Sequence, residues 1–243
     1  MKIIDCFWEQ KNIGKNTVEI LIEETDRYNK TQMDQVTQDY DYAVVKVPMN
    51  MPEFNVGLCD MGFACMESQM NMGISLKTFD FSKISHLYDD TMYEIVNSQE
   101  SFRSVASHIT PGMFSTDRIT IDPIFGETIG CQRYINWMTE EYNSKRSQLI
   151  KILYKNEHIG FMLVRIKNET IHLLLNGLYK LYQGKGLGIL TPASPIMYAK
   201  KTFLPILKEE TSISSNNIPV VKLYNRLGFQ ILQQTYVFIK HFI

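Results

Sequence analysis

The chain has 243 residues, of which 44% are hydrophobic and 21% are charged, an ordinary composition for a globular protein that can bury a sizeable core. This composition excludes a disordered or collagen-like chain. The 25 Lys and Arg residues nearly balance the 26 Asp and Glu residues. The overall charge therefore gives no indication of nucleic acid or of an anionic membrane as a partner.

The start of the chain and its hydropathy predict a soluble, cytoplasmic protein. Asp5 and Glu9 interrupt the first apolar run too early for a signal peptide. No stretch approaches the roughly 20 apolar residues that a membrane-spanning helix needs. The four cysteines form no C-x-x-C pair and are too sparse for a disulfide scaffold, so we expect buried free thiols and no metal site.

The N-terminal third mixes strand-like and helical patterns. Residues 17–23 and 42–47 are rich in β-branched residues and predict two strands, whereas 25–39 has weak helical spacing. Residues 50–72 are dense in methionine, which favours a packed core or a domain interface. The polar residues 80–90 show no clear period and predict a boundary.

The rest of the chain alternates between strands and helices. A strand at 92–97 is followed by a helical stretch near 102–106, a loop at 111–123 and a helix at 125–141. Three further strands, at 148–154, 159–166 and 171–178, are separated by short turns and predict a meander. The pattern predicts an α/β fold with a largely antiparallel sheet.

A glycine-rich turn follows the third strand of the meander. In Gln183-Gly-Lys-Gly-Leu-Gly188, backbone amides can face one anion, and a helix N-terminus behind them adds a favourable dipole. A phosphate or pyrophosphate is the expected ligand. Tyr179 and Ile189 stand where a P-loop and a dinucleotide fingerprint each need glycine, so both motifs are excluded. The turn alone is equally consistent with a plain strand-to-helix connection.

A second motif lies further along the chain. Residues 211–215 predict a strand, and Asn217 to Gly228 predict a helix capped at both ends. The loop at 183–188 and the Asn-x6-Tyr-x3-Gly-Phe helix at 217–229 together resemble the GNAT superfamily of acyl-CoA N-acyltransferases. The resemblance implies the GNAT fold, with a mixed, largely antiparallel central sheet flanked by helices.

The resemblance also implies a cosubstrate, acetyl-CoA, and the residues that bind it. Tyr224 matches the tyrosine that protonates the leaving thiolate, a role that suits a phenol held near sulfur. A tyrosine on an amphipathic helix with a solvated hydroxyl is the alternative. The implied coenzyme A contacts are Leu178, Gln183, Gly184, Lys185, Gly186, Leu187, Gly188, Ile189 and Asn217.

Two prolines depart from the family's pattern. Pro192 and Pro195 fall where GNAT proteins begin an uninterrupted helix, and proline in a helix interior costs about 3 kcal/mol. A helix that starts late, with Ser194 as N-cap and Pro195 at the first position, would accommodate both prolines.

The N-terminal third carries an echo of the C-terminal motif. The segment that begins Met61-Gly-Phe matches the segment that begins Leu227-Gly-Phe, with a constant offset along both. A degenerate half-copy explains this echo. We therefore expect a partial GNAT-like domain over residues 1–85 and a complete GNAT domain over residues 86–243.

Three further segments resemble one branch, the dTDP-fucosamine acetyltransferases, which acetylate the 4-amino group of a dTDP-linked 4-amino-4,6-dideoxy sugar. They are Phe7 to Gly14, Phe114 to Phe125 with its following aromatic helix, and the segment from Met61 to Glu67. The resemblance implies Glu67 as general base, a nucleotide-linked amino sugar as partner and a role in polysaccharide biosynthesis. The implied substrate contacts are Arg118, Asp122, Tyr134 and Asn176.

Several of these roles have alternatives. Glu67 could be an outward-facing strand residue, and His172 is a second candidate base. Arg118 suits a phosphate, but it could equally form a structural ion pair with Asp117 or Asp122. Other acceptors for the same fold are a peptide, a polyamine or an antibiotic amine, and a non-catalytic CoA-binding module is a further alternative. A homodimer through the C-terminal strand is also considered.

Overall fold

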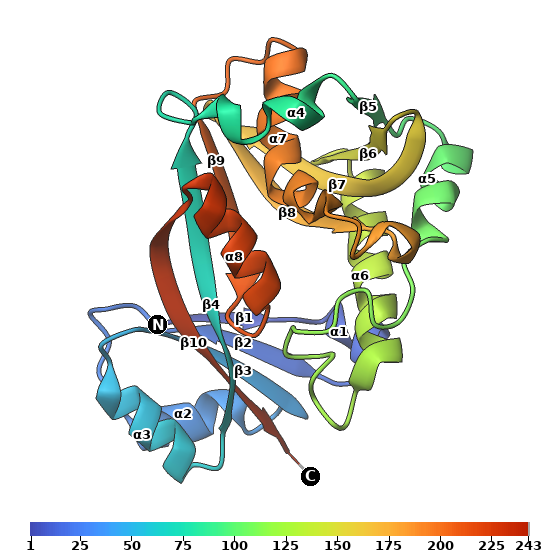
Figure 1. Ribbon diagram of the computed structural model, residues 1–243. Coiled ribbons are helices and arrows are strands. Elements are labelled where there is room, and N and C mark those ends of the chain that lie inside the picture. The colour runs from blue at the N-terminus through green and yellow to red at the C-terminus, as the bar shows by residue number, and fades with distance from the viewer. Residues whose placement is uncertain (243) are drawn as a thin grey trace.

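The computed structural model describes residues 1–242, which form one mixed sheet of ten strands with helices on both faces (Figure 1). The strand order is β1-β2-β3-β10-β4-β9-β8-β7-β6-β5. Neighbours β2–β3 and β8–β9 are parallel, and the other neighbours are antiparallel. The predicted mixed, largely antiparallel sheet flanked by helices is confirmed.

The elements have the following bounds. The strands are β1 (Lys2–Asp5), β2 (Thr17–Leu21), β3 (Tyr42–Pro48), β4 (Ala64–Ser75), β5 (Thr91–Ile95), β6 (Gln148–Tyr154), β7 (Glu157–Lys167), β8 (Thr170–Leu178), β9 (Lys208–Ser214) and β10 (Gln230–His241). The α-helices are α1 (Glu9–Ile13), α2 (Lys30–Thr37), α3 (Pro52–Asp60), α4 (Ser85–Tyr88), α5 (Gln99–Ala106), α6 (Gly126–Asn143), α7 (Leu190–Lys201) and α8 (Ile218–Leu227). Short 3-10 turns are η1 (Phe81–Lys83), η2 (Lys180–Tyr182) and η3 (Leu187–Ile189).

The central strands of the C-terminal part are buried on both faces. In β7, Met162 and Val164 belong to a core that also holds the apolar residues of α7 and α8. Phe161 and Leu163 point the other way, into a core shared with α5 and α6. Because side chains alternate across a strand, the continuous apolar run of β7 supplies both layers.

The N-terminal part has its own two layers. Residues Ala43, Val45 and Val47 of β3 pack into a core with residues of α2 and α3. The alternate residues Tyr42 and Val44 face a smaller cluster that also contains residues from α1, the loop before α6 and β10. This second cluster joins segments from both ends of the chain.

The sequence similarity between the segments that begin at Met61 and Leu227 corresponds to repeated structural elements. β3, α3 and β4 begin at residues 42, 52 and 64, and β9, α8 and β10 begin at residues 208, 218 and 230, with identical spacing within each set. Both helices start with proline in the first turn. The N-terminal α3 and β4 were not predicted as separate elements, because residues 50–72 were interpreted only as one methionine-rich segment.

The two repeats exchange their last strands. β10 pairs with β3, and β4 pairs with β9, so each repeat is completed by a strand of the other. Gln69 of β4 and Thr235 of β10, which occupy equivalent positions in the two repeats, pair with each other at the centre. In Figure 1, β4 and β10 run side by side through the middle of the molecule. This arrangement has approximate two-fold symmetry.

The strand exchange affects two predictions, the division into two domains and the dimer through the C-terminal strand. The sheet of residues 1–85 contains β10 between β3 and β4, so this segment shares its sheet with the rest of the chain. The boundary near residue 85 stays a prediction. β10 pairs with β4 over Gln230–Ile239 and with β3 over Thr235–His241, so most of its length lies inside the sheet, and the homodimer through this strand stays a prediction.

Two other sequence predictions can be placed. Met51, Met61, Met70 and Met72 are buried, as expected for a methionine-rich core. Of the four cysteines, all free thiols, Cys6 and Cys131 are buried, but Cys59 and Cys65 are exposed, so the prediction of burial is wrong for two of them.

Among residues 1–242, no helix has the length and apolar character needed to cross a bilayer.

Candidate active site

A cleft of about 1220 Å³ opens where two parallel strands separate. β8 and β9 pair only from Thr170 to Leu173, after which β8 continues to Leu178 without pairing with β9. A bulge at Leu174, opposite β7, accompanies this divergence. The gap lets one cleft reach from α7 and α8 on one side of the sheet to α6 and its preceding loop on the other.

The glycine-rich loop forms one end of the cleft. Gly184 and Gly186 adopt left-handed backbone conformations, with φ of 75° and 79°, and a Cβ added at either position would meet no atom within 4 Å. An anion could therefore approach the backbone closely. Gln183, Gly184 and Gly188 line the cleft, as do Leu178 and Asn217, but Lys185, Gly186, Leu187 and Ile189 are not among the lining residues.

The helix behind the loop begins earlier than predicted. α7 starts at Leu190, with Pro192 in its first turn and Pro195 inside the helix, so the prediction of Ser194 as N-cap is wrong. Pro192 occupies a turn where the backbone N–H has no helical partner in any case. Pro195 lacks the N–H that would bond to the carbonyl of Thr191. The amide of Asn176 donates to that carbonyl instead, at 2.7 Å, which compensates for the missing bond.

Tyr224 lines the cleft from α8. The residue is 2% exposed, and its ring packs edge-on against Phe229, with 4.7 Å between ring centroids. Burial raises the pKa of the Tyr224 phenol, and the neighbouring polar side chains of Thr211 and Asn176 lower it part of the way. The hydroxyl therefore stays protonated at neutral pH, as a proton donor must.

Asn217 and Gly228 hold the helix that carries Tyr224. The side-chain oxygen of Asn217 accepts from the backbone N–H of Val220 at 3.4 Å, and Gly228 ends the helix with φ of 101°. Both predicted caps are confirmed.

Glu67 reaches the same cleft from β4 of the N-terminal part. A bulge at Met66 interrupts the pairing with β10 immediately before it, and bulges of this kind re-aim side chains next to functional sites. Burial raises the pKa of the Glu67 carboxyl, whereas the nearby Ser214 side chain and the charge of Arg118 lower it part of the way. The net rise makes Glu67 a stronger proton acceptor than an ordinary glutamate.

The loop before α6 and α6 itself form the wall opposite the sheet. Arg118 and Tyr134 both line the cleft, and Tyr134 packs against Phe114 with 4.5 Å between ring centroids. Asp122 does not line the cleft: it is 2% exposed, and its carboxylate accepts hydrogen bonds from His241 and from the backbone of Ile124, at 2.8 and 2.9 Å. Asp122 therefore holds the loop before α6 in place, and the prediction that it contacts the substrate is not supported by its position.

Several lining residues were not predicted from the sequence. β4 alternates polar and apolar residues, so Gln69 and Asn71 face the cleft beside Glu67 while Met70 is buried. That two-residue period was a usable signal. No local pattern pointed to Arg133, because the residue that it binds, Glu9, lies far away in the chain. The other unpredicted polar lining residues include Glu24, Ser212, Glu210 and Gln233.

His172, the second candidate base, lies on β8 with its Nδ1 atom 3.7 Å from the carboxylate of Glu210. Both side chains line the cleft. Within residues 1–242, no group of three or more His, Cys, Asp and Glu side chains is placed to hold a metal ion.

Comparison with solved structures identifies the fold. The chain superposes on a GCN5-related N-acetyltransferase from Sphaerobacter thermophilus with a TM-score of 0.60 and 10% identity, covering 93% of this chain and 73% of that one. A GCN5-related N-acetyltransferase from Kribbella flavida gives 0.58 and 11%, covering 92% and 80%. A tandem GNAT protein from the clavulanic acid biosynthesis pathway gives 0.57 and 11%, covering 93% and 75%.

These likenesses show that the chain has the GNAT fold, which the sequence motifs predicted. No family model and no curated protein matches the sequence itself.

Proposed function

We propose that the protein is an acyl-CoA N-acyltransferase that transfers an acetyl group from acetyl-CoA to a primary amine. One observation carries this proposal: a single cleft crosses the sheet and brings an anion-binding loop, Tyr224 and Glu67 together. A non-catalytic CoA-binding module would need the loop, but it would not need a buried acid and a carboxylate with a raised pKa in the same cleft.

The loop would hold the pyrophosphate of coenzyme A. Backbone amides from Lys185 to Ile189 would donate to it, and the first turn of α7 would add its dipole. The separated end of β8 near Leu178 would pair with the pantetheine arm, while Asn217 would contact its far end. The carbonyl of Leu178 accepts from the Gln183 side chain at 3.0 Å, which fixes this end of the strand.

The chemistry then follows from two side chains. Glu67 would take a proton from the ammonium form of the acceptor, and the free amine would attack the thioester carbonyl. A C–N bond forms, the C–S bond breaks, and Tyr224 would give its proton to the leaving thiolate. The second proton that nitrogen loses on collapse of the tetrahedral intermediate would return to the Tyr224 phenolate, and Glu67 would release its proton to solvent. The products are the amide and free coenzyme A. Both reactants are held in one complex, so no acyl-enzyme is required.

The acceptor that the cleft fits best is a nucleotide-linked 4-amino-4,6-dideoxy sugar, of the kind used for surface polysaccharides. Gln69, Asn71, Ser212 and Gln233 form a sheet surface of neutral amides and hydroxyls, which suits sugar hydroxyls. The aromatic pair Phe114 and Tyr134, followed by Trp137, offers flat surfaces for a sugar or a base. Arg118 would face a phosphate.

A second acceptor class is favoured by a different observation. Glu24, Glu67 and Glu210 come from separate parts of the sequence but line the same cleft. The sequence shows no acidic run, so this concentration of carboxylates emerges only from the fold. Carboxylates favour cations, and a polycationic amine such as a polyamine is therefore the second candidate.

Thiol release distinguishes these candidates. The protein is mixed with acetyl-CoA and, in separate reactions, with dTDP-4-amino-4,6-dideoxy sugars, the corresponding methyl glycosides and spermidine. Release of free coenzyme A with the dTDP sugars supports the first candidate, and preferential release with spermidine supports the second. If acetyl-CoA binds but no amine increases thiol release, the proposal of catalysis is wrong and the binding module is favoured.

A further inference from the structure

A buried ion pair joins the two parts of the chain directly behind the cleft. Glu9, on α1, is 3% exposed, and its carboxylate accepts from Nε of Arg133 on α6 at 2.9 and 3.1 Å. Nη2 of Arg133 donates to the same carboxylate. Burial alone would raise the pKa of Glu9, but the hydrogen bonds and charge of Arg133 outweigh it, and the pKa is lowered. Glu9 is therefore an anion at neutral pH.

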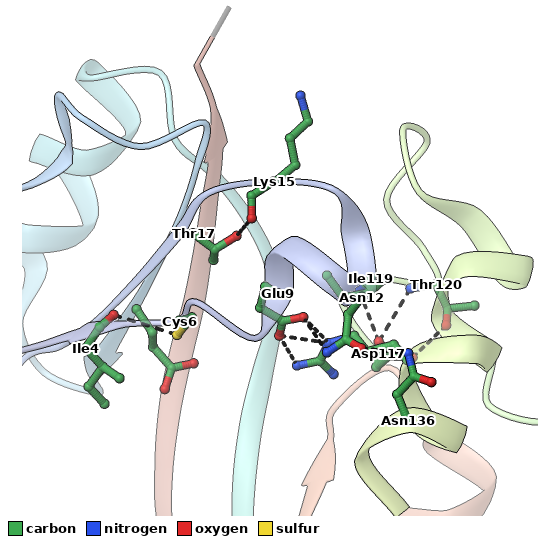
Figure 2. Close-up of polar contacts among 12 residues, drawn as sticks. Ile4, Cys6, Glu9, Asn12, Lys15, Thr17, Asp117, Ile119, Thr120 and Asn136 are labelled. Atoms are coloured by element: carbon green, nitrogen blue, oxygen red, sulfur yellow. Dashed lines mark hydrogen bonds and ion pairs between the residues drawn. The ribbon is translucent and has the colours of Figure 1, made fainter. Parts of the chain in front are cut away.

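A second pair of side chains reinforces this junction one turn further along both helices. The amide of Asn136 on α6 donates to the side-chain oxygen of Asn12 on α1 at 2.8 Å, and the amide of Asn12 donates to Glu9 at 3.2 Å. Figure 2 shows Glu9 and Asn12 facing Asn136 across the junction. Glu9 engages the whole Nε edge of Arg133 and therefore fixes the guanidinium in one orientation.

The remaining edge of Arg133 is available to a ligand. Its side chain is 20% exposed and lines the cleft next to Tyr134. Nη1 takes no part in a hydrogen bond among residues 1–242, in contrast to Nε and Nη2. Arg118 lines the same wall, and its Nε has no hydrogen-bond partner within the described part of the chain either. Of these two guanidinium groups, only that of Arg133 has an unused donor outside the protein interior, because the unpaired Nε of Arg118 is itself buried.

We infer that Arg133 binds a phosphate group of the acceptor and that Glu9 is the positioning residue that presents it. The inference rests on the proposed function and deepens it, because it assigns the phosphate contact to a residue held by the N-terminal part. A guanidinium is suited to this task, since its planar donors match phosphate oxygens. With one edge fixed on Glu9, little side-chain entropy is lost when the other edge binds.

The test measures anion binding without turnover. Inorganic pyrophosphate is titrated calorimetrically into the protein with coenzyme A at saturation, so that the loop at 183–188 is already occupied. Arg133→Lys keeps the charge but loses the planar donors, and we expect its Kd for pyrophosphate to rise at least 10-fold. The Kd for coenzyme A should stay within 2-fold of the wild-type value, which also shows that the variant is folded.

The chain provides a matched control near the end of the same helix. Arg165 donates to Glu141 of α6 at 2.6 Å, and this carboxylate is also buried, but neither residue lines the cleft. Arg165→Lys should leave both Kd values unchanged. If Arg133→Lys loses coenzyme A binding through misfolding, Glu9→Gln combined with Arg133→Gln replaces the ion pair by two amides and is measured instead.

The outcomes separate this inference from the proposed function. Unchanged pyrophosphate affinity in the folded Arg133 variant, or no pyrophosphate binding to the wild type, would overturn the inference while acetyl transfer could still occur. In Glu9→Gln, Arg133 keeps its charge but loses its fixed orientation, so weaker pyrophosphate binding with unchanged coenzyme A binding is expected. An unaltered Glu9→Gln variant would refute the positioning role.

Discussion

Replacement of Tyr224 by phenylalanine tests the proposed proton donor directly. The substitution removes one hydroxyl and leaves the ring packed against Phe229, where the ring centroids are 4.7 Å apart. The side chains of Thr211 and Asn176 lie beside the phenol and lower its pKa part of the way, so its removal takes one polar neighbour from each. Thr211 still donates to the carbonyl of Leu173 at 2.9 Å, and Asn176 still donates to Thr191, so both retain a bond.

The expected magnitudes differ for catalysis and stability. A removed general acid lowers kcat about 100-fold or more, which corresponds to about 2.7 kcal/mol in the activation free energy. One lost hydrogen bond costs about 1 kcal/mol of folding free energy, and in a chain of this size that lowers Tm by roughly 2–4 °C. Tyr224→Phe should therefore be folded and bind acetyl-CoA normally while turning over slowly.

Steady-state thiol release at saturating acetyl-CoA measures kcat, and thermal unfolding measures Tm. Tyr198→Phe is the matched control, because Tyr198 is also buried, at 4% exposure, and its hydroxyl donates to Gln148 at 3.4 Å outside the cleft. It should lose a similar amount of stability without a loss of kcat. If Tyr224→Phe keeps kcat within 2-fold of the wild type, Tyr224 is not the proton donor.

The buried carboxylates and the loop give three further predictions. Because burial raises the pKa of Glu67, the acidic limb of kcat/KM should lie above the usual range of a glutamate, and Glu67→Gln should abolish that limb and lower kcat about 100-fold; an unchanged pH profile would contradict its role as base. Glu209 is fully buried with a raised pKa and binds its proton more tightly in the folded state than in the unfolded one, so its contribution to stability is greatest at low pH and declines as pH rises. The Tm of Glu209→Gln should therefore rise relative to that of the wild type from pH 4 to pH 8; a difference in Tm that does not change with pH would refute the assignment. Calorimetry should find one coenzyme A per chain, and Gly186→Val should weaken it at least 10-fold because a φ of 79° suits only glycine; residual tight binding would locate the coenzyme elsewhere.

Local patterns in the sequence were sufficient to predict the helix caps and the turn around the glycine-rich loop. The caps of α8 at Asn217 and Gly228, and the glycines before α7, are each encoded within a few residues. Such features need no knowledge of the tertiary fold. The start of α7 was mispredicted because the bond that compensates for Pro195 comes from Asn176, on a different strand.

The residues on the α6 side of the cleft could not be predicted in the same way. Glu9 and Arg133 are 124 residues apart, and nothing local identifies them as partners. Asp122 stood in a matching motif, but its carboxylate bonds to His241 near the other end of the chain. The constant offset between the two Gly-Phe segments indicated that the repeats existed. The exchange of β4 and β10 between them could not be predicted, because tertiary packing decides the register between distant strands.

The repeat also explains why the N-terminal part should contain no second coenzyme site. Leu223 on α8 corresponds to Gly57 on α3, and a Cβ at Gly188 would lie 3.3 Å from the Leu223 side chain. In the N-terminal repeat the ring of Tyr28 takes the equivalent space: a Cβ at Gly57 would lie 2.1 Å from that ring, and the Tyr28 hydroxyl donates to the Gly57 carbonyl at 3.0 Å.

The loop that carries Tyr28 differs in charge as well as in shape. Where the C-terminal loop has three glycines, this loop has Glu23, Glu24 and Asp26, and Asp26 accepts from the amino group of Met1 at 2.6 Å. Carboxylates would repel a pyrophosphate. If the C-terminal loop holds the coenzyme, as proposed, the N-terminal part contributes Glu67 and the Glu9 that binds Arg133, and the strand exchange ties that contribution to the sheet of the other repeat.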